Sequence, residues 1–288
     1  MSINRRTSAR LRPCVRLGML SIPLIYSDIA TDAAQVSDDE ALKGVVEQGI
    51  KSGCVEGKIF IDTTTVHPST TTSITVQLSD SGASYIAAPV FGATPLAQSG
   101  TLLIAIAGPP SAISTISPFL EGVIARQVIH VGTIPAQALL LKTTSNFVTA
   151  SLMMLLSEAH TLAEKIGLPG PVLEQLVESN FGAYAYGVSK RLTSGAYYPP
   201  SGQAPSSGLE LGIKDVGHGV NLAREQGMYL EIGEMYLDAA REAKEYGDQQ
   251  GRKCDSSAVF GVVRQRAGLG FESRVVEERD AKREGEGK

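Results

Sequence analysis

The stretch PAQALLLKTTSNFVTASLMMLLSEAHTLAEKIG, residues 135–167, decides the fold. Its apolar residues recur at helical spacing, and no proline interrupts it after the first position. Gly167 and the nearby Pro169 supply the usual signals that end a helix. At ~1.5 Å per residue such a helix would span ~45 Å. This length is enough to form the spine of a domain.

One face of this helix carries an amine and a carboxamide. Lys142 and Asn146 are four residues apart, so their side chains lie one above the other. An amine that moves a proton beside an amide that holds an oxygen suits a carbonyl or hydroxyl substrate. The alternative is that Lys142 points at water, because lysine is rarely buried. The opposite side carries leucines, namely Leu139, Leu140, Leu155, Leu156 and Leu162.

The chain before the long helix alternates between short apolar runs and helical patterns. Pro68 is well placed to open a helix, whereas Pro118 is expected to end or kink the helix that contains it. Strands that alternate with helices predict an α/β layer architecture with a parallel sheet. The expected strands are 58–62, 84–90, 101–107 and 127–131, and the expected helices are 68–78 and 109–124.

After Gly132 every apolar pattern is helical, except for a loop rich in Pro, Ser and Gly at 197–208. The expected helices are 135–167, 171–180, 184–193, 209–227 and 231–246. The predicted fold class is therefore α/β plus all-α. A truncated Rossmann-like parallel sheet domain over 28–131 precedes a helical domain over 132–268 built on one long helix. Residues 269–288 are dominated by charges of both signs and predict a disordered tail.

Composition narrows the classes of function. The 288 residues are 43% hydrophobic and carry a net charge of −4, which is unlike the basic footprint of a nucleic-acid-binding protein. No run reaches the roughly 18 uninterrupted apolar residues of a membrane helix. The three cysteines and four histidines show no ligand spacing, so we expect neither a disulfide framework nor a bound metal.

Residues 1–27 have an unusual composition. Five arginines precede the first acid, Asp28, and a mostly apolar run extends from Leu17 to Tyr26. This arrangement resembles a mitochondrial transit peptide and, more weakly, a signal peptide. The preferred interpretation is an irregular N-terminus without a targeting signal. The expected location is therefore cytoplasmic, with a mitochondrial one as the alternative.

Four motifs follow one another in a fixed order. Asp62-Thr-Thr-Thr-Val-His-Pro68 is similar to D-x-S-T-x-x-P, and Ala88-Pro-Val-Phe-Gly-Ala93 is similar to A-P-V-S-G-G. Lys142-x-x-x-Asn146 and the pair Lys214-Asp215 come later. In this order and spacing they resemble the β-hydroxyacid dehydrogenase family, which includes 3-hydroxyisobutyrate and 6-phosphogluconate dehydrogenases. The resemblance runs from about Ser37 to Ser257.

The resemblance implies a dinucleotide-binding domain, a helical domain that often supports dimers, and hydride transfer between NAD or NADP and a small β-hydroxyacid. It implies that Lys142 is the general acid/base, with a pKa lowered by burial. Asn146 would fix a substrate oxygen. The resemblance also implies that Thr64 and Gly92 contact the substrate. Thr65 and Lys214 would contact the cofactor.

Each of these residues also has a plain structural explanation. Threonines favour strands because they are β-branched, and Gly92 suits an ordinary turn. Lys214 suits a solvated helix face, and Asp215 needs no role beyond being a helix residue.

Two departures from the family pattern affect the expected function. The family opens with a strand, G-x-G-x-x-G and a helix, whose amides hold the cofactor pyrophosphate. Only Gly18, Gly44 and Gly49 occur among the first fifty residues, so we expect this opening unit to be missing, through a mispredicted exon boundary or a real loss. Phe91 replaces the usual serine and Ala93 the second glycine. The first change removes a hydrogen bond to substrate and fills space.

Three hypotheses follow. The first is an NAD(P)-dependent oxidoreductase that acts on a small β-hydroxyacid. The second is a catalytically inactive remnant, or a dimerising interaction module, that lacks the cofactor loop. The third is that the missing segment leaves a sheet edge uncovered and prone to aggregation.

Overall fold

Three parallel strands begin the part of the chain that the computed structural model describes, residues 31–53 and 55–286. They are β1 (Thr31–Ala34), β2 (Ile59–Asp62) and β3 (Ser84–Ala87). The interpretation of residues 1–27 lies outside the described residues. Because β1 pairs only with β2 among these residues, it forms one edge of the described sheet.

The second half of the sheet runs in the opposite direction. Strands β5 (Leu102–Ala107) and β6 (Ala125–Gly132) are parallel to each other, but β5 is antiparallel to β3 and to β4 (Val90–Phe91). The sheet is therefore mostly parallel, which confirms the predicted Rossmann-like sheet domain, and its antiparallel pairs are those of β5 with β3 and β4. The chain reverses at β4 and the short helix α3 (Thr94–Gln98), with no helix crossing the face of the sheet as a parallel connection requires.

Alternating side chains divide the sheet between two apolar layers. Phe60 and Tyr85 point to the face covered by α1 (Asp39–Lys51) and α2 (Pro68–Asp80). Their neighbours Ile61 and Ile86 point to the other face, against α4 (Pro110–Ile116), which a 3-10 turn over Ser117–Phe119 follows. Successive residues of a strand face opposite sides, so each short strand contributes to both layers. The predicted strands 58–62, 101–107 and 127–131 and the helix 68–78 are confirmed to within a few residues. The helix predicted over 109–124 ends at Ile116, close to Pro118, and the strand predicted over 84–90 is divided into β3 and β4.

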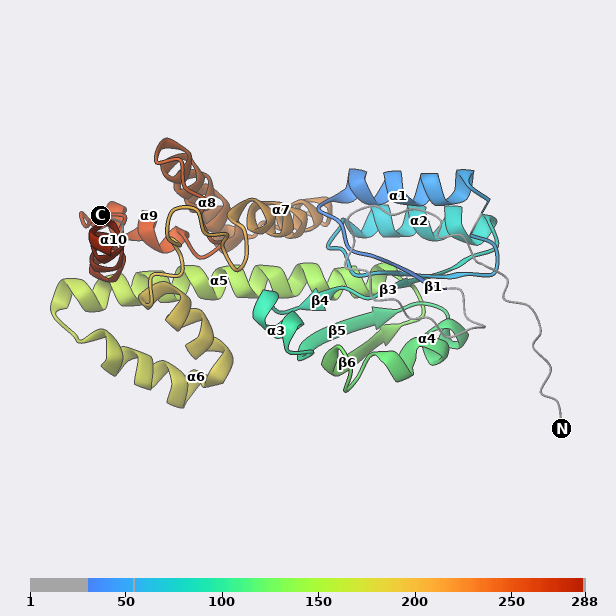
Figure 1. Cartoon of the computed structure of the whole chain (residues 1–288), viewed down its shortest axis with the longest axis horizontal. Coiled ribbons are helices and arrows are strands. Elements are labelled where there is room, and N and C mark those ends of the chain that lie inside the picture. Colours follow the sequence, from blue (N-terminus) through green and yellow to red (C-terminus); the bar gives the residue numbers. More distant parts are fainter. Residues whose placement is uncertain (1–30, 54, 287–288) are drawn as a thin grey trace.

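Helix α5 (Ala136–Ile166) connects the sheet to the helical part of the molecule (Figure 1). Ala138 and Leu139 belong to the sheet core, whereas Met153 and Leu156 belong to the core of the helices. The helix ends at Gly167, whose φ of 75° lies in the left-handed region. By length and a mean hydropathy of 1.3 it would also pass as a membrane span, a test that core helices of soluble proteins pass as well.

The remaining helices pack around the second half of α5. They are α6 (Gly170–Thr193), α7 (Leu209–Glu225), α8 (Glu231–Gln249) and α9 (Val259–Arg266). Gly182, with φ 81° and ψ 177°, breaks α6 into the two predicted segments. The loop predicted before α7 is confirmed, and the buried Asp255 fixes it by accepting hydrogen bonds from Arg191 and the Ser207 amide.

The prediction of a disordered tail was wrong for the described residues 269–286. Residues Arg274–Glu286 form α10, which is held by apolar contacts and ion pairs. Phe271 is buried and stacks on Tyr246 with ring centroids 3.9 Å apart. Val276 is fully buried, and Asp280 pairs with Arg252 at 2.7 Å. The prediction failed because it used only the charge-rich composition. Two buried apolar residues, Phe271 and Val276, are enough to dock this segment.

We expect Phe271→Ala to destabilise the protein by about 3 to 5 kcal/mol, because it empties a buried aromatic site. Val275→Ala is the matched control, since Val275 is 45% exposed and should change the free energy of unfolding by less than about 0.5 kcal/mol. Denaturant unfolding of both variants measures the difference. Equal, small effects would mean that α10 is not docked in solution.

Candidate active site

The predicted site residues converge where β1, β2 and β3 end. The carboxyl ends of these strands lie at one edge of the sheet, near the first half of α5 and α7 (Figure 1). Open α/β sheets bind ligands at this edge. The loop after β2 carries Thr64 and Thr65, the segment after β3 carries Gly92, and α5 carries Lys142.

Lys142 lies half-buried on α5 with its amine over an aromatic ring. Its Nζ is 4.8 Å from the centroid of the Phe91 ring. Burial lowers the pKa of Lys142, while nearby Asp215 acts in the opposite direction and Lys214 lowers the pKa further. In the described part of the chain, no carbonyl or carboxylate accepts a hydrogen bond from this amine. The group is therefore free to exchange a proton with a bound molecule.

A chain of polar contacts links α5, α7 and the loop after β2. Asn146 Nδ2 donates to Asp215 Oδ2 at 3.1 Å, and the other oxygen of Asp215 lies 3.0 Å from Lys214 Nζ. Lys214 in turn donates to the carbonyl of Thr65 at 2.5 Å. Asp215 is thus the central acceptor, and Asn146 retains one amide hydrogen and its oxygen. Sequence reasoning gave Asp215 no role because these partners are distant in the chain.

Thr64 lies beneath this chain of contacts and is only 2% exposed. Its Oγ1 accepts from the Val36 amide at 3.1 Å, and its amide donates to Asp62 Oδ1 at 2.9 Å. Tyr85 donates to the other oxygen of Asp62 at 2.7 Å. Burial raises the pKa of Asp62 to about 6 despite these hydrogen bonds. Here Thr64 shapes the loop that presents Thr65, and a direct contact with substrate stays a prediction.

Gly92 is exposed and has a φ of 132°. A Cβ at this position would come within 3.0 Å of the side chains of Leu96 and Leu102. Both the backbone conformation and the close approach therefore require glycine. Its contact with substrate stays a prediction.

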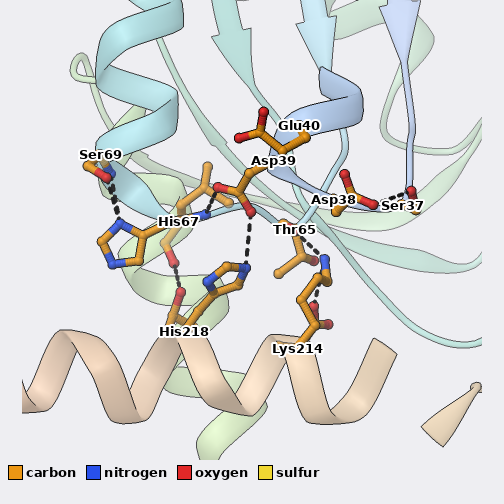
Figure 2. Close-up of polar contacts among 12 residues, drawn as sticks. Ser37, Asp38, Asp39, Glu40, Thr65, His67, Ser69, Lys214 and His218 are labelled. Atoms are coloured by element: carbon orange, nitrogen blue, oxygen red, sulfur yellow. Dashed lines mark hydrogen bonds and ion pairs between the residues drawn. The ribbon is translucent and has the colours of Figure 1, made fainter. Parts of the chain in front are cut away.

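Three further polar residues fasten α7 to the sheet domain (Figure 2). Asp39, at the start of α1, accepts from the His67 amide at 2.9 Å and lies 3.3 Å from His218 Nε2. The rings of His67 and His218 are 5.8 Å apart. Burial opposes ionisation of Asp39, yet hydrogen bonds from His218, Thr70 and His67 hold its pKa below the ordinary value. Sequence reasoning weighed the histidines only as metal ligands, and the described residues contain no suitable group for a metal.

The edge fits the nicotinamide end of a dinucleotide. The Lys142 amine has no acceptor in the described residues, whereas His67 Nε2 lies 3.8 Å from Glu225 Oε1. An unpaired amine where α/β sheets bind ligands indicates a polar ligand. Lys214 of α7 reaches Thr65 in the loop after β2, as Figure 2 shows. A nucleotide-binding sheet domain joined to helices, with a half-buried unpaired amine at the junction, fits the class of NAD(P)-dependent oxidoreductases.

Comparison with known proteins agrees with this class. Residues 26–132 match the NAD binding domain of 6-phosphogluconate dehydrogenase. The NADH-dependent oxidoreductase ucdB of Aspergillus ustus is 29% identical over 265 residues, which cover 92% of this chain and 87% of that protein. The 2-(hydroxymethyl)glutarate dehydrogenase of Eubacterium barkeri is 29% identical over 77% of this chain and 71% of that protein.

A solved structure shares the fold. The crystal structure of 3-hydroxyisobutyrate dehydrogenase from Salmonella typhimurium superposes with a TM-score of 0.68 at 20% identity, covering 81% of this chain and 79% of that one. By these matches the chain is similar to proteins of the β-hydroxyacid dehydrogenase family.

The raised pKa of Asp62 predicts a pH-dependent stability. The folded protein holds this proton more tightly than the unfolded chain, whose Asp pKa is 3.8. Stability from Asp62 is thus complete below pH 3.8 and is lost as the pH rises through about 6. We expect Asp62→Asn to remove this loss, on the order of 2 to 3 kcal/mol between pH 4 and 7.

Chemical denaturation of wild type and variant across this pH range measures the effect. Asp80→Asn, at an exposed position on α2, is the matched control and should leave the pH dependence unchanged. Parallel stability curves for wild type and Asp62→Asn would contradict the prediction.

Proposed function

We propose that the protein transfers hydride reversibly between NAD or NADP and a small β-hydroxyacid. The observation that carries the proposal is the half-buried Lys142 amine at the ligand-binding edge of the sheet. Its pKa is lowered, and it has no acceptor within the described residues. The names of ucdB and of 2-(hydroxymethyl)glutarate dehydrogenase, an NADH-dependent oxidoreductase and a hydroxyacid dehydrogenase, support it.

The residues of this chain would handle the proton and the substrate oxygen. Bound NAD or NADP supplies the hydride acceptor or donor. In oxidation the neutral amine of Lys142 takes the proton of the substrate hydroxyl, and in reduction the ammonium returns it. Asn146, held by Asp215, presents its second amide hydrogen to the substrate oxygen. Lys214, fixed to Thr65, closes the cofactor side of the site.

The alternative of an inactive remnant rests on the glycine loop. The sequence contains no G-x-G-x-x-G between a strand and a helix. Loss of about 4 kcal/mol of cofactor binding would lower affinity roughly a thousandfold. The relatives favour the enzyme over the remnant. Titration with NADH and NADPH separates the two, because the remnant would bind neither at millimolar concentration.

We expect Lys142→Met to lower kcat about 100- to 10,000-fold, because the proton acceptor is removed. Cofactor affinity should change little. In the oxidation direction, wild-type activity should rise with pH through a pKa below the ordinary lysine value of 10.5, and the variant should lose this limb. Steady-state kinetics over pH measure both effects.

Lys165→Met is the matched control, since Lys165 lies on the same helix and donates to the Ala267 carbonyl instead. It should keep wild-type kinetics. Full turnover by Lys142→Met would remove the role assigned to this residue.

We also propose that the protein forms a homodimer through α5 and α6. Val148, Leu155 and Leu162 are seven residues apart, so they form one stripe on α5, and each is at least 55% exposed. Helix α6 adds exposed apolar side chains, namely Val172, Leu176, Phe181 and Tyr184. Many exposed apolar side chains on two neighbouring helices are typical of a permanent interface. A second copy of the chain offers a matching apolar stripe.

Leu155→Asp should convert the dimer into a monomer, because it places a charge at the centre of the apolar stripe. Light scattering coupled to size-exclusion chromatography measures the mass. Val76→Asp is the control, since Val76 is similarly exposed on α2 of the sheet domain. A monomeric wild type at micromolar concentration, or a Leu155→Asp dimer, would refute the interface.

A further inference from the structure

Phe91 gives the candidate active site an apolar wall beside the proton-exchanging amine. We propose that this wall makes Phe91 the residue that determines specificity. It selects β-hydroxyacids whose substituent on carbon 2 is a hydrocarbon or aryl group over those with a polar substituent there. The proposal rests on the proposed function, because it assumes that the substrate binds beside Lys142.

The two sides of Lys142 differ in chemistry. On the α7 side lie Asn146, Asp215 and Lys214, which are linked by hydrogen bonds or ion pairs. On the β4 side lies Phe91, whose ring is 4.8 Å from the amine. A substrate whose oxygen contacts the amine therefore has polar groups on one side and a carbon surface on the other.

The apolar side is held firmly in place. Phe91, Val131 and Leu141 pack against the core of the sheet domain. The next residue, Gly92, approaches the side chains of Leu96 and Leu102, so the carbon surface continues along β4 and α3. Leu96 is 45% exposed, which leaves its surface available to a bound molecule.

The ring changes what the site can hold. A hydroxyl at position 91 could pair with a polar substituent of the substrate, whereas a ring offers no lone pair and no conventional donor. A polar group placed against the ring loses water without gaining a partner, which disfavours binding. A hydrocarbon group in the same place gains buried contact. The ring also keeps its attraction for the Lys142 ammonium, because that group lies over its face.

The test uses three 3-hydroxypropanoates that differ only on carbon 2, which carries a phenyl, a methyl or a hydroxyl group. Calorimetry measures their dissociation constants, and steady-state assays measure kcat/KM in parallel. Wild type should bind the phenyl compound at least about 10-fold more tightly than the hydroxyl compound, with the methyl compound between them. Phe91→Ser should reduce this preference to about 3-fold or less.

Phe91→Leu is the matched variant, since it keeps a carbon surface but removes the ring. It should retain most of the preference for hydrocarbon groups and should keep the fold if Phe91→Ser loses stability. The proposal is overturned if wild type prefers the hydroxyl compound, if none of the three compounds binds, or if Phe91→Leu loses the preference as fully as Phe91→Ser.

The binding measurement separates this proposal from the proposed function. If the binding preference changes with the residue at position 91 but no hydride is transferred, the role of Phe91 in specificity is supported and the oxidoreductase function is refuted. If the protein turns over the substrates but the preference is the same in wild type and in the Phe91 variants, the oxidoreductase function is supported and the role of Phe91 in specificity is refuted.

Discussion

One continuous helix, α5, belongs to two hydrophobic cores at once, and the site depends on this. Its first turns are buried with the sheet through Ala138 and Leu139, and its later turns are buried among the helices through Met153 and Leu156. Lys142 lies between these two anchored regions. The position of its amine relative to the strand ends is therefore set by packing on both sides.

Electrostatic balance around the amine is as specific as its position. Burial and Lys214 favour the neutral form of Lys142, whereas Asp215 and the face of the Phe91 ring favour the charged form. A general acid/base works best when neither form dominates strongly. Asp215 also orders Asn146, so one carboxylate raises the pKa of Lys142 and fixes the neighbouring amide.

Local patterns in the sequence predicted most of the elements, because helical spacing and strand alternation are local properties. The long helix, its end at Gly167 and the pairing of Lys142 with Asn146 on one face follow from spacing alone. The resemblance to a family supplied Thr65 and Lys214, which the structure brings into contact.

The features that were missed depend on partners far apart in the chain. The reversal of direction at β4 follows from how the connection packs, and the docking of α10 depends on Phe271 meeting Tyr246. Asp39 and His218 meet only because α1 and α7 do. A single sequence contains no signal for such pairs, and charge-rich composition concealed the anchors of α10.

The shared helix also limits how the two domains can move. Within the described residues the backbone passes from the sheet to the helices once, along α5, so a relative rotation of the domains has to pivot about this rod. Lys142 lies on this rod. The contacts of Lys214 with Thr65 and of His218 with Asp39 join α7 to the sheet domain away from it. A rotation that admits or releases a ligand would then break these two polar contacts, while the Lys142 amine, which lies on the rod, moves little.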